Sequence, residues 1–299
     1  MKIGSLCSGY GGLDMAVEAF FNAETVWMSD IDKASSLVIE KRWGLPNLGD
    51  LKTVDWENTE LVEILTAGYP CQPFSTAGQR KGANDSRHLW PSIKEIISRI
   101  RPGVVILENV RGHLTLGFKE VLKDLTEIGY DARWEIVRAS DVGAPHRRER
   151  LFIIANPNSQ THFQSRRTNR PIYESTSQII NGSDRNEHRC CGKTASNSNS
   201  EQLQADGQAP GLGWRFKTPS ELSMLPTPNP LDQSKLNPKF VEYMMGLPEG
   251  WVTDLPLSRA QIFRLLGNGV VPQQAYKAIE ILNNKVQYQN IEHILEDTK

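Results

Sequence analysis

The composition of this chain excludes several classes of protein. Its 299 residues allow one large domain, alone or with a smaller one, and a substantial core without disulfide staples. The 34 lysines and arginines against 35 aspartates and glutamates give a formal net charge of −1. This balance excludes a polycationic nucleic-acid coat but leaves room for a local basic groove.

Cysteine content and hydropathy indicate an intracellular protein. The four cysteines show no paired zinc spacing and are too few for a secreted disulfide framework. We therefore expect no metal site, His188, Cys190 and Cys191 included. Lys2 is not followed by the apolar run of a signal peptide, and no stretch reaches the roughly 18 apolar residues of a membrane span. The expected location is the cytoplasm.

Short apolar runs alternate with helical patterns over residues 1–157. Strands are expected at 2–7, 25–29, 65–67, 104–108, 133–137 and 151–155. Helices are expected at 14–21, 34–42, 90–100 and 119–128. This alternation predicts an α/β fold with a mainly parallel sheet and crossover helices.

The composition changes after this region. Residues 158–233 are rich in Ser, Asn, Gln, Thr and Arg and have few apolar runs, which predicts a smaller inserted unit or a loose insertion. Apolar patterns return at 240–247 and 275–282, so residues 234–299 are expected to pack back on the domain formed by residues 1–157.

The ends of the first strands carry a candidate cofactor site. Glycines after the first strand permit a tight turn and a close ligand, and an acid after the second is where a nucleotide ribose is gripped. A possible third strand segment ends at Asp50. The glycines and the two acids together suggest an adenosine-containing cofactor. For the glycines alone, a plain glycine turn is the alternative. The candidate residues are Ser8, Gly9, Tyr10, Gly11, Gly12, Leu13, Asp30, Ile31, Asp50, Leu51 and Pro70, with Asn268 and Gly269 from a late turn.

Cys71 lies in a proline-rich loop beyond the apolar residues 64–67, where α/β sheets place their ligands. An inert buried thiol is the alternative, but the neighbouring prolines favour an ordered, exposed loop. Glu108 ends the apolar run 104–107, where a buried carboxylate needs a partner or a proton; a solvated acid is the alternative. Together, a thiol that adds to carbon 6 of cytosine and a carboxyl group at ring nitrogen 3 would make carbon 5 nucleophilic.

Arginines precede and follow the last strand of the first region. Arg148 and Arg150 share one side of a presumed extended segment and could meet a phosphate or a flipped base. His146 has a lower claim to a direct role. A solvated rim is the alternative reading, but the local excess fits phosphate binding. The candidate DNA contacts are Gln72, Ser75, Arg147, Arg166 and Arg167.

The order of these motifs resembles that of the DNA (cytosine-5) methyltransferase family of bacteria and phages. The matching segments are Ser8 to Gly12, Pro70-Cys71-Gln72, Glu108-Asn109-Val110, Arg148-Glu149-Arg150 and Gly267-Asn268-Gly269-Val270. The resemblance implies an S-adenosylmethionine-dependent fold with a seven-stranded sheet and a target-recognition domain in the insertion. It also implies Cys71 as nucleophile, Glu108 as acid, Arg148 and Arg150 in the catalytic site, S-adenosyl-L-methionine as cofactor and double-stranded DNA as substrate.

Three positions depart from the family pattern. Cys7 stands where the family often has a phenylalanine that packs on the cofactor, Ile31 replaces a residue that is often aromatic, and Gly269 replaces a frequent serine. None of these removes a catalytic group. We expect a monomer in a bacterial cell or a phage-infected host, with a restriction endonuclease as a possible companion.

Three other functions compete with this one. A transfer-RNA cytosine methyltransferase uses the same scaffold, but the Cys-Phe-Thr tripeptide usual in that branch is missing here. A catalytically silent DNA-binding relative is disfavoured by the intact Cys71, Glu108 and Arg150. An oxidoreductase that uses the glycine turn would leave the cysteine loop unexplained.

Overall fold

The computed structural model describes residues 1–70, 89–158 and 236–296, with side chains described up to residue 284. Its strands are β1 (Lys2–Leu6), β2 (Glu24–Ser29), β3 (Ile64–Gly68), β4 (Val104–Val110), β5 (Tyr130–Arg138) and β6 (Glu149–Pro157). Its helices are α1 (Gly12–Phe21), α2 (Lys33–Trp43), α3 (Trp90–Ile100), α4 (Phe118–Glu127), α6 (Pro238–Met244), α7 (Arg259–Asn268) and α8 (Pro272–Glu296). Two short 3-10 helices are η2 (Arg111–Thr115) and η3 (Ala139–Val142).

The strands form one mixed sheet in the order β2-β1-β3-β4-β6-β5. Neighbouring strands from β2 to β4 are parallel, whereas β6 is antiparallel to both β4 and β5. Five of the strands therefore point the same way, and the expected α/β fold with a mostly parallel sheet is confirmed.

The described part of the sheet has six strands, one fewer than the resemblance predicted. The segment that ends at Asp50 was expected as a possible strand, but only the single bridge between Asn47 and Met28 of β2 forms there. Pro46 precedes Asn47 and has no N–H group to donate, so a regular ladder cannot continue through it.

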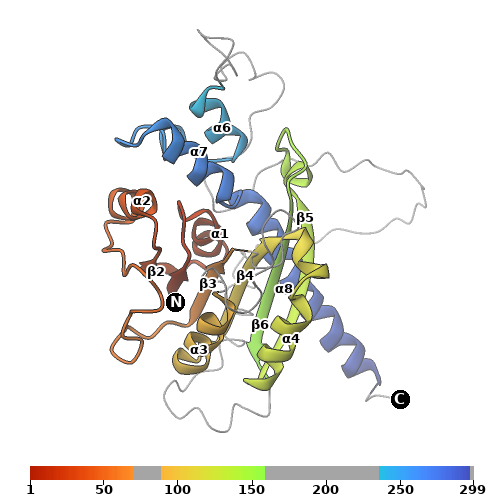
Figure 1. The fold of residues 1–299 in the computed structure, drawn as a ribbon. Helices are drawn as coiled ribbons and strands as arrows, with labels where there is room; N and C mark the ends of the chain where they lie inside the picture. Colours follow the sequence, from red (N-terminus) through yellow and green to blue (C-terminus); the bar gives the residue numbers. More distant parts are fainter. Residues whose placement is uncertain (71–88, 159–235, 297–299) are drawn as a thin grey trace, which may run out of the picture.

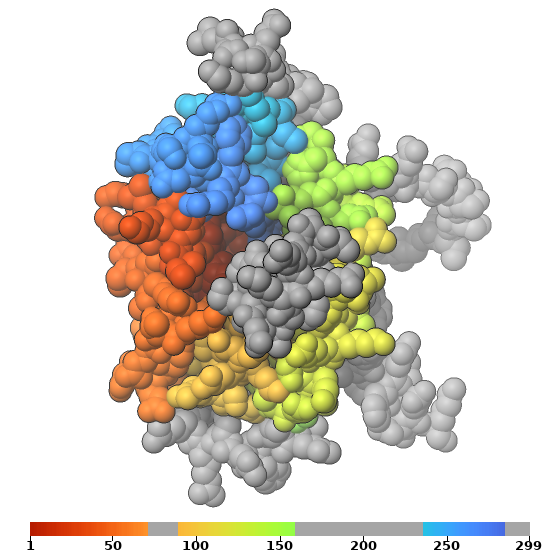
Figure 2. All heavy atoms as spheres, in the orientation of Figure 1, coloured from red at the N-terminus to blue at the C-terminus, as the bar shows by residue number. Residues whose placement is uncertain are grey.

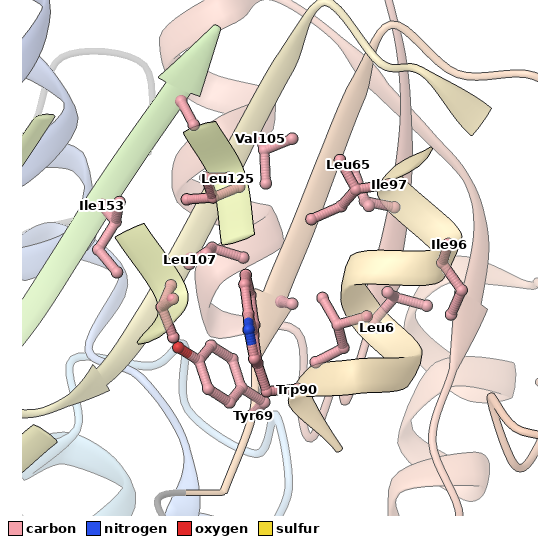
Figure 3. Packing of buried hydrophobic residues seen from close by; sticks show 14 of the residues in the cluster. Leu6, Leu65, Tyr69, Trp90, Ile96, Ile97, Val105, Leu107, Leu125 and Ile153 are labelled. Carbon is pink, nitrogen blue, oxygen red and sulfur yellow. The ribbon is translucent and has the colours of Figure 1, made fainter. Parts of the chain in front are cut away.

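Alternating side chains of β4 fill two hydrophobic layers. Val105 and Leu107 pack with α3 and α4 on one face, in the core drawn in Figure 3, whereas Val104 and Ile106 pack with α1 and α8 on the other. The helices cover both faces of the sheet in this way (Figure 1). Burial of each such side chain stabilises the fold by about 1.5–3 kcal/mol. The strand β4 therefore holds the backbone of Glu108, near its end, in a fixed position.

The C-terminal segment returns to the first region, and its contacts position the site. In the space-filling view, blue residues of the C-terminal segment lie directly against the N-terminal elements (red) (Figure 2). Its helices α7 and α8 contact α2 and α1, respectively. The helix α7 was not expected. It begins with a capping box in which the Ser258 N–H donates to the Gln261 Oε1 at 2.8 Å and the Ser258 hydroxyl accepts from the Gln261 N–H at 3.4 Å.

Residues 159–235 lie outside the described residues, and they include nearly all of the predicted insertion, residues 158–233. Within the described part of the chain, no helix is long and apolar enough to cross a membrane.

Candidate functional site

The glycine turn after β1 is fixed by its own backbone and by an acid from β2. Gly9 and Gly11 have φ of 58° and 80°, a region that favours glycine, and the Gly11 N–H donates to the Ser8 carbonyl at 2.8 Å. The Gly9 N–H donates to Asp30 Oδ2 at 2.8 Å. The structure thus brings together the predicted residues 8–13 and Asp30 at the carboxyl ends of β1 and β2.

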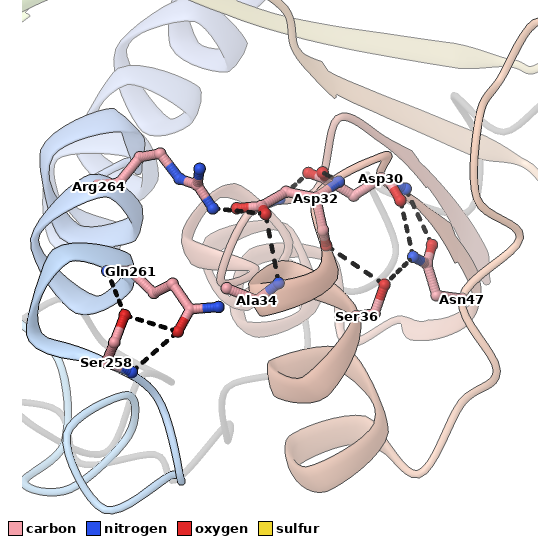
Figure 4. Close-up of polar contacts among 9 residues, drawn as sticks. Asp30, Asp32, Ala34, Ser36, Asn47, Ser258, Gln261 and Arg264 are labelled. Atoms are coloured by element: carbon pink, nitrogen blue, oxygen red, sulfur yellow. Dashed lines mark hydrogen bonds and ion pairs between the residues drawn. The ribbon is translucent and has the colours of Figure 1, made fainter.

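Asp30 is itself held in a fixed position. Its carboxylate also accepts the Asp32 N–H at 2.8 Å, and the side chain of Asn47 bonds to its backbone N–H and carbonyl at 2.9 and 2.7 Å (Figure 4). Burial raises the pKa of Asp30 above its ordinary value, and the hydrogen bonds from the Asp32 and Gly9 N–H groups oppose the rise. Asn47 was not predicted, because its role depends on the return of the chain to the end of β2.

Around this acid, one apolar side chain is left exposed. Ile31 is 76% exposed, whereas Leu51 is 5% exposed. Burial raises the pKa of the Cys7 thiol above its ordinary value, and the negative charges of Asp30 and Asp50 raise it further. Leu51 lies in the same hydrophobic cluster as Leu6 at the end of β1, and Cys7 packs against that cluster.

A second, fully buried acid fixes the start of α1. Asp14 is 1% exposed and accepts hydrogen bonds from the hydroxyl groups of Ser5 at 3.0 Å and Thr66 at 2.6 Å. It therefore joins α1 to β1 and β3. Burial raises the pKa of Asp14 to about 6, and the two hydroxyl donors oppose this rise. Asp14 was not predicted as a site residue, because it lies within an ordinary helical pattern.

Glu108 lies near the carboxyl end of β4 and is only 6% exposed. Its Oε1 lies 2.9 Å from Arg150 Nε, and Gly68 of β3 is its partner in the sheet. Burial raises the pKa of Glu108 to about 7, while the charges of Arg150 and Arg148 act in the opposite direction. A carboxyl group with this pKa carries a proton in a large fraction of molecules at neutral pH, so it can donate a hydrogen bond.

The adjacent Asn109 ties β4 to the residues that lead into the cysteine loop. Its Nδ2 donates to the Tyr69 carbonyl at 3.1 Å and so holds the backbone there. Tyr69 is buried against Trp90 (Figure 3). Its hydroxyl lies 3.0 Å from His113 Nε2. The chain is thus fixed up to Pro70, which is exposed. The predicted Cys71, Gln72 and Ser75 follow outside the described residues.

Arg148 differs from its prediction. Its φ of 26° breaks the extended segment expected for Arg148 and Arg150, and its Nη2 donates to the carbonyls of Gly267 at 2.8 Å and Gly269 at 2.6 Å. The two guanidinium groups therefore point to different partners: that of Arg150 to Glu108, and that of Arg148 to the C-terminal segment. Gln274, at the start of α8 and fully buried, donates to the carbonyls of Arg148 and Val137, each at 2.7 Å.

The remaining candidates lie at the edge of this site. Arg147 and Asn268 are exposed, and Arg166 and Arg167 lie outside the described residues. The His146 Nε2 lies 2.7 Å from the Met244 carbonyl, a contact that holds the end of α6. No cluster of three or more potential metal ligands occurs in the described ranges.

Comparison with known proteins assigns the family. A family model for the C-5 cytosine-specific DNA methylase matches residues 1–222. The chain belongs to this family. The expected enzyme class, a DNA (cytosine-5-)-methyltransferase, is therefore confirmed.

Individual relatives of this methylase agree with the assignment. Type II methyltransferase M.NlaX of Neisseria lactamica is 29% identical, over 90% of this chain and 92% of its own. Type II methyltransferase M.HhaI of Haemophilus parahaemolyticus is 36% identical, over 50% of this chain and 47% of its own.

Solved structures of the same fold include two methyltransferases. S. pombe Dnmt2 is 19% identical with a TM-score of 0.59, over 95% of this chain and 99% of that one. Entamoeba histolytica EhMeth is 18% identical with a TM-score of 0.60, over 96% of this chain and 98% of that one.

Proposed function

We propose that this methylase transfers a methyl group from S-adenosyl-L-methionine to carbon 5 of a cytosine in a specific duplex sequence, through a covalent adduct with Cys71. The observation that carries this proposal is Glu108. It is a buried acid with a pKa raised to about 7, paired with Arg150, on the strand next to the one that leads into the cysteine loop. Such an acid suits a ring nitrogen that gains negative charge during the reaction.

The described residues fit the proposed cofactor. Its adenosine would lie against the glycine turn of residues 8–13, with Asp30 and Asp50 as acceptors for its polar groups. The exposed Ile31 offers an apolar surface to its base. When bound, the cofactor would supply a methyl group on a positively charged sulfur.

The proposed chemistry uses one thiol and one acid. The Cys71 thiolate adds to carbon 6 of the cytosine, while Glu108 donates to nitrogen 3 and Arg150 holds the carboxyl group in place. Carbon 5 then carries the electron pair that forms the new bond to the methyl carbon. A base, such as an ordered water, removes the proton from carbon 5, and the carbon 6–sulfur bond breaks to release Cys71.

The substrate must be double-stranded DNA with its target base outside the helix, since neither face of a stacked ring is open to Cys71. Extrusion of a base costs a few kcal/mol, offset by contacts in the pocket. We assign residues 158–233, with Arg166 and Arg167, to target recognition, and Gln72, Ser75 and Arg147 to contacts with the DNA. Two of the relatives are named type II methyltransferases, which supports a role in restriction and modification.

A trapping experiment tests the covalent step. Duplex DNA with 5-fluorocytosine at the target should form a complex with the wild type that survives denaturing electrophoresis, because fluorine cannot leave as a proton. Bisulfite sequencing of a co-expressed plasmid first identifies the target. Cys71→Ser should form no such complex, whereas Glu108→Gln should form it more slowly. Methylation by Cys71→Ser at the wild-type rate would contradict the proposal.

A further inference from the structure

Tyr10 lies within the glycine turn, yet its ring is fully buried against the C-terminal segment. Its hydroxyl donates to the Val270 carbonyl at 2.7 Å, a bond between residues 260 positions apart. A Cβ atom placed on Gly269 would lie 1.9 Å from the Tyr10 Cε1 atom, much closer than a real contact allows. The ring of Tyr10 therefore occupies the space of a side chain at position 269.

Glycine is needed at position 269 because a side chain has no space there, and not because of the backbone conformation. Gly269 has φ of −76°, which any residue can adopt. The fit is also reciprocal, because a Cβ atom on Gly12 would lie 2.1 Å from the Val270 carbonyl oxygen. The two turns are thus in direct backbone contact, and each has glycine where the other approaches.

The turn that contains Gly269 also contacts Arg148. The Gly269 carbonyl accepts the hydrogen bond from Arg148, two residues before the Arg150 that pairs with Glu108. On the other side of the glycine turn, the Trp251 indole donates to the Tyr10 carbonyl at 3.1 Å. A displacement of the Tyr10 ring would therefore move both the glycine turn and the carbonyl that Arg148 binds.

We propose that Tyr10 and Gly269 are a matched pair of positioning residues. The ring of Tyr10 fills the space that Gly269 leaves, and this contact sets the backbone of the glycine turn and the placement of Arg148. The inference rests on the proposed cofactor site. It adds that the C-terminal segment influences cofactor affinity through the contact between Gly269 and the Tyr10 ring.

A double-mutant cycle on the full-length protein tests the pair. Gly269→Ser should raise the Kd for S-adenosylhomocysteine, measured by calorimetry, and the KM for S-adenosylmethionine at least tenfold, with a smaller change in kcat. In the Tyr10→Ala background, Gly269→Ser should change the Kd and the KM less than threefold each, because the space that the Tyr10 ring occupied is then free for the serine side chain. Gly112→Ser is the control, since a Cβ atom there meets nothing within 4 Å.

The outcomes separate this inference from the proposed function. If the wild type does not bind S-adenosylhomocysteine, the proposed cofactor is wrong. If the wild type binds it and Gly269→Ser binds it equally well, the pairing is wrong. The pairing is also wrong if Gly269→Ser raises the Kd and KM by the same factor in the Tyr10→Ala background as in the wild type. A loss of thermal stability in Gly269→Ser with unchanged Kd and KM would also overturn it. If Gly269→Ser does not fold, a folded Tyr10→Ala/Gly269→Ser protein that binds would support the pair, and an unfolded one would oppose it.

Discussion

Replacement of Glu108 by glutamine should change how the stability of the protein depends on pH. Burial raises the pKa of Glu108 from 4.5 to about 7, so the folded chain binds this proton more tightly than the unfolded chain. The stabilisation is fully present below pH 4.5 and is lost as the pH rises to about 7. Because one pKa unit corresponds to about 1.4 kcal/mol, the wild type should lose about 2–3 kcal/mol relative to Glu108→Gln between pH 5 and pH 8.

Urea unfolding at pH 5 and pH 8 measures this difference directly. The other titrating groups, including Asp14, are present in both proteins and cancel in the comparison. Glu120→Gln, at an exposed position of α4, is the control and should follow the wild type. If the free energy of unfolding changed equally with pH in the wild type and in Glu108→Gln, the reasoning would be refuted. In methylation assays, the wild-type kcat/KM should fall above about pH 7, since the protonated carboxyl is the donor, and Glu108→Gln should lack that fall.

Two other substitutions test the supports of the site. Asp30→Asn should raise the KM for S-adenosylmethionine at least fivefold in steady-state kinetics with little change in kcat, because it removes the charge that fixes the glycine turn; an unchanged KM would exclude Asp30 from the cofactor site. Gln274→Met should lower the free energy of unfolding by about 2 kcal/mol, because two buried carbonyls lose their donor, and should reduce kcat through Arg148. An unfolding midpoint and kcat equal to those of the wild type would show that the bonds of Gln274 contribute nothing.

Local patterns predicted the elements of the first region well. Apolar runs with β-branched residues identified strands such as β4, and the residues at their carboxyl ends identified Asp30 and Glu108, because parallel strands place those ends together. The segment before Asp50 was overestimated, since Pro46 and the single bridge at Asn47 prevent a ladder. The helix α7 was missed although its capping box, Ser258 with Gln261, is visible in the sequence.

Contacts between distant segments could not be predicted. Asn47, Gln274 and Trp251 act through hydrogen bonds to backbone groups, and no local spacing specifies which carbonyl or N–H a side chain meets after folding. Arg148 shows the same limit: its positive φ and its bonds to Gly267 and Gly269 depend on where the C-terminal segment returns. The side chains to which we assign the chemistry therefore stand at positions that a sequence pattern marks, whereas the side chains that hold the backbone around them do not.

The contact between Tyr10 and the Val270 carbonyl also has a consequence for synthesis of the protein. A ribosome makes the chain from its N-terminus at about 5–20 residues per second, so the glycine turn emerges long before residue 270. Until then the turn lacks the surface against which its tyrosine packs. The proposed cofactor site is thus complete only when nearly the whole chain, residues 158–233 included, has been made.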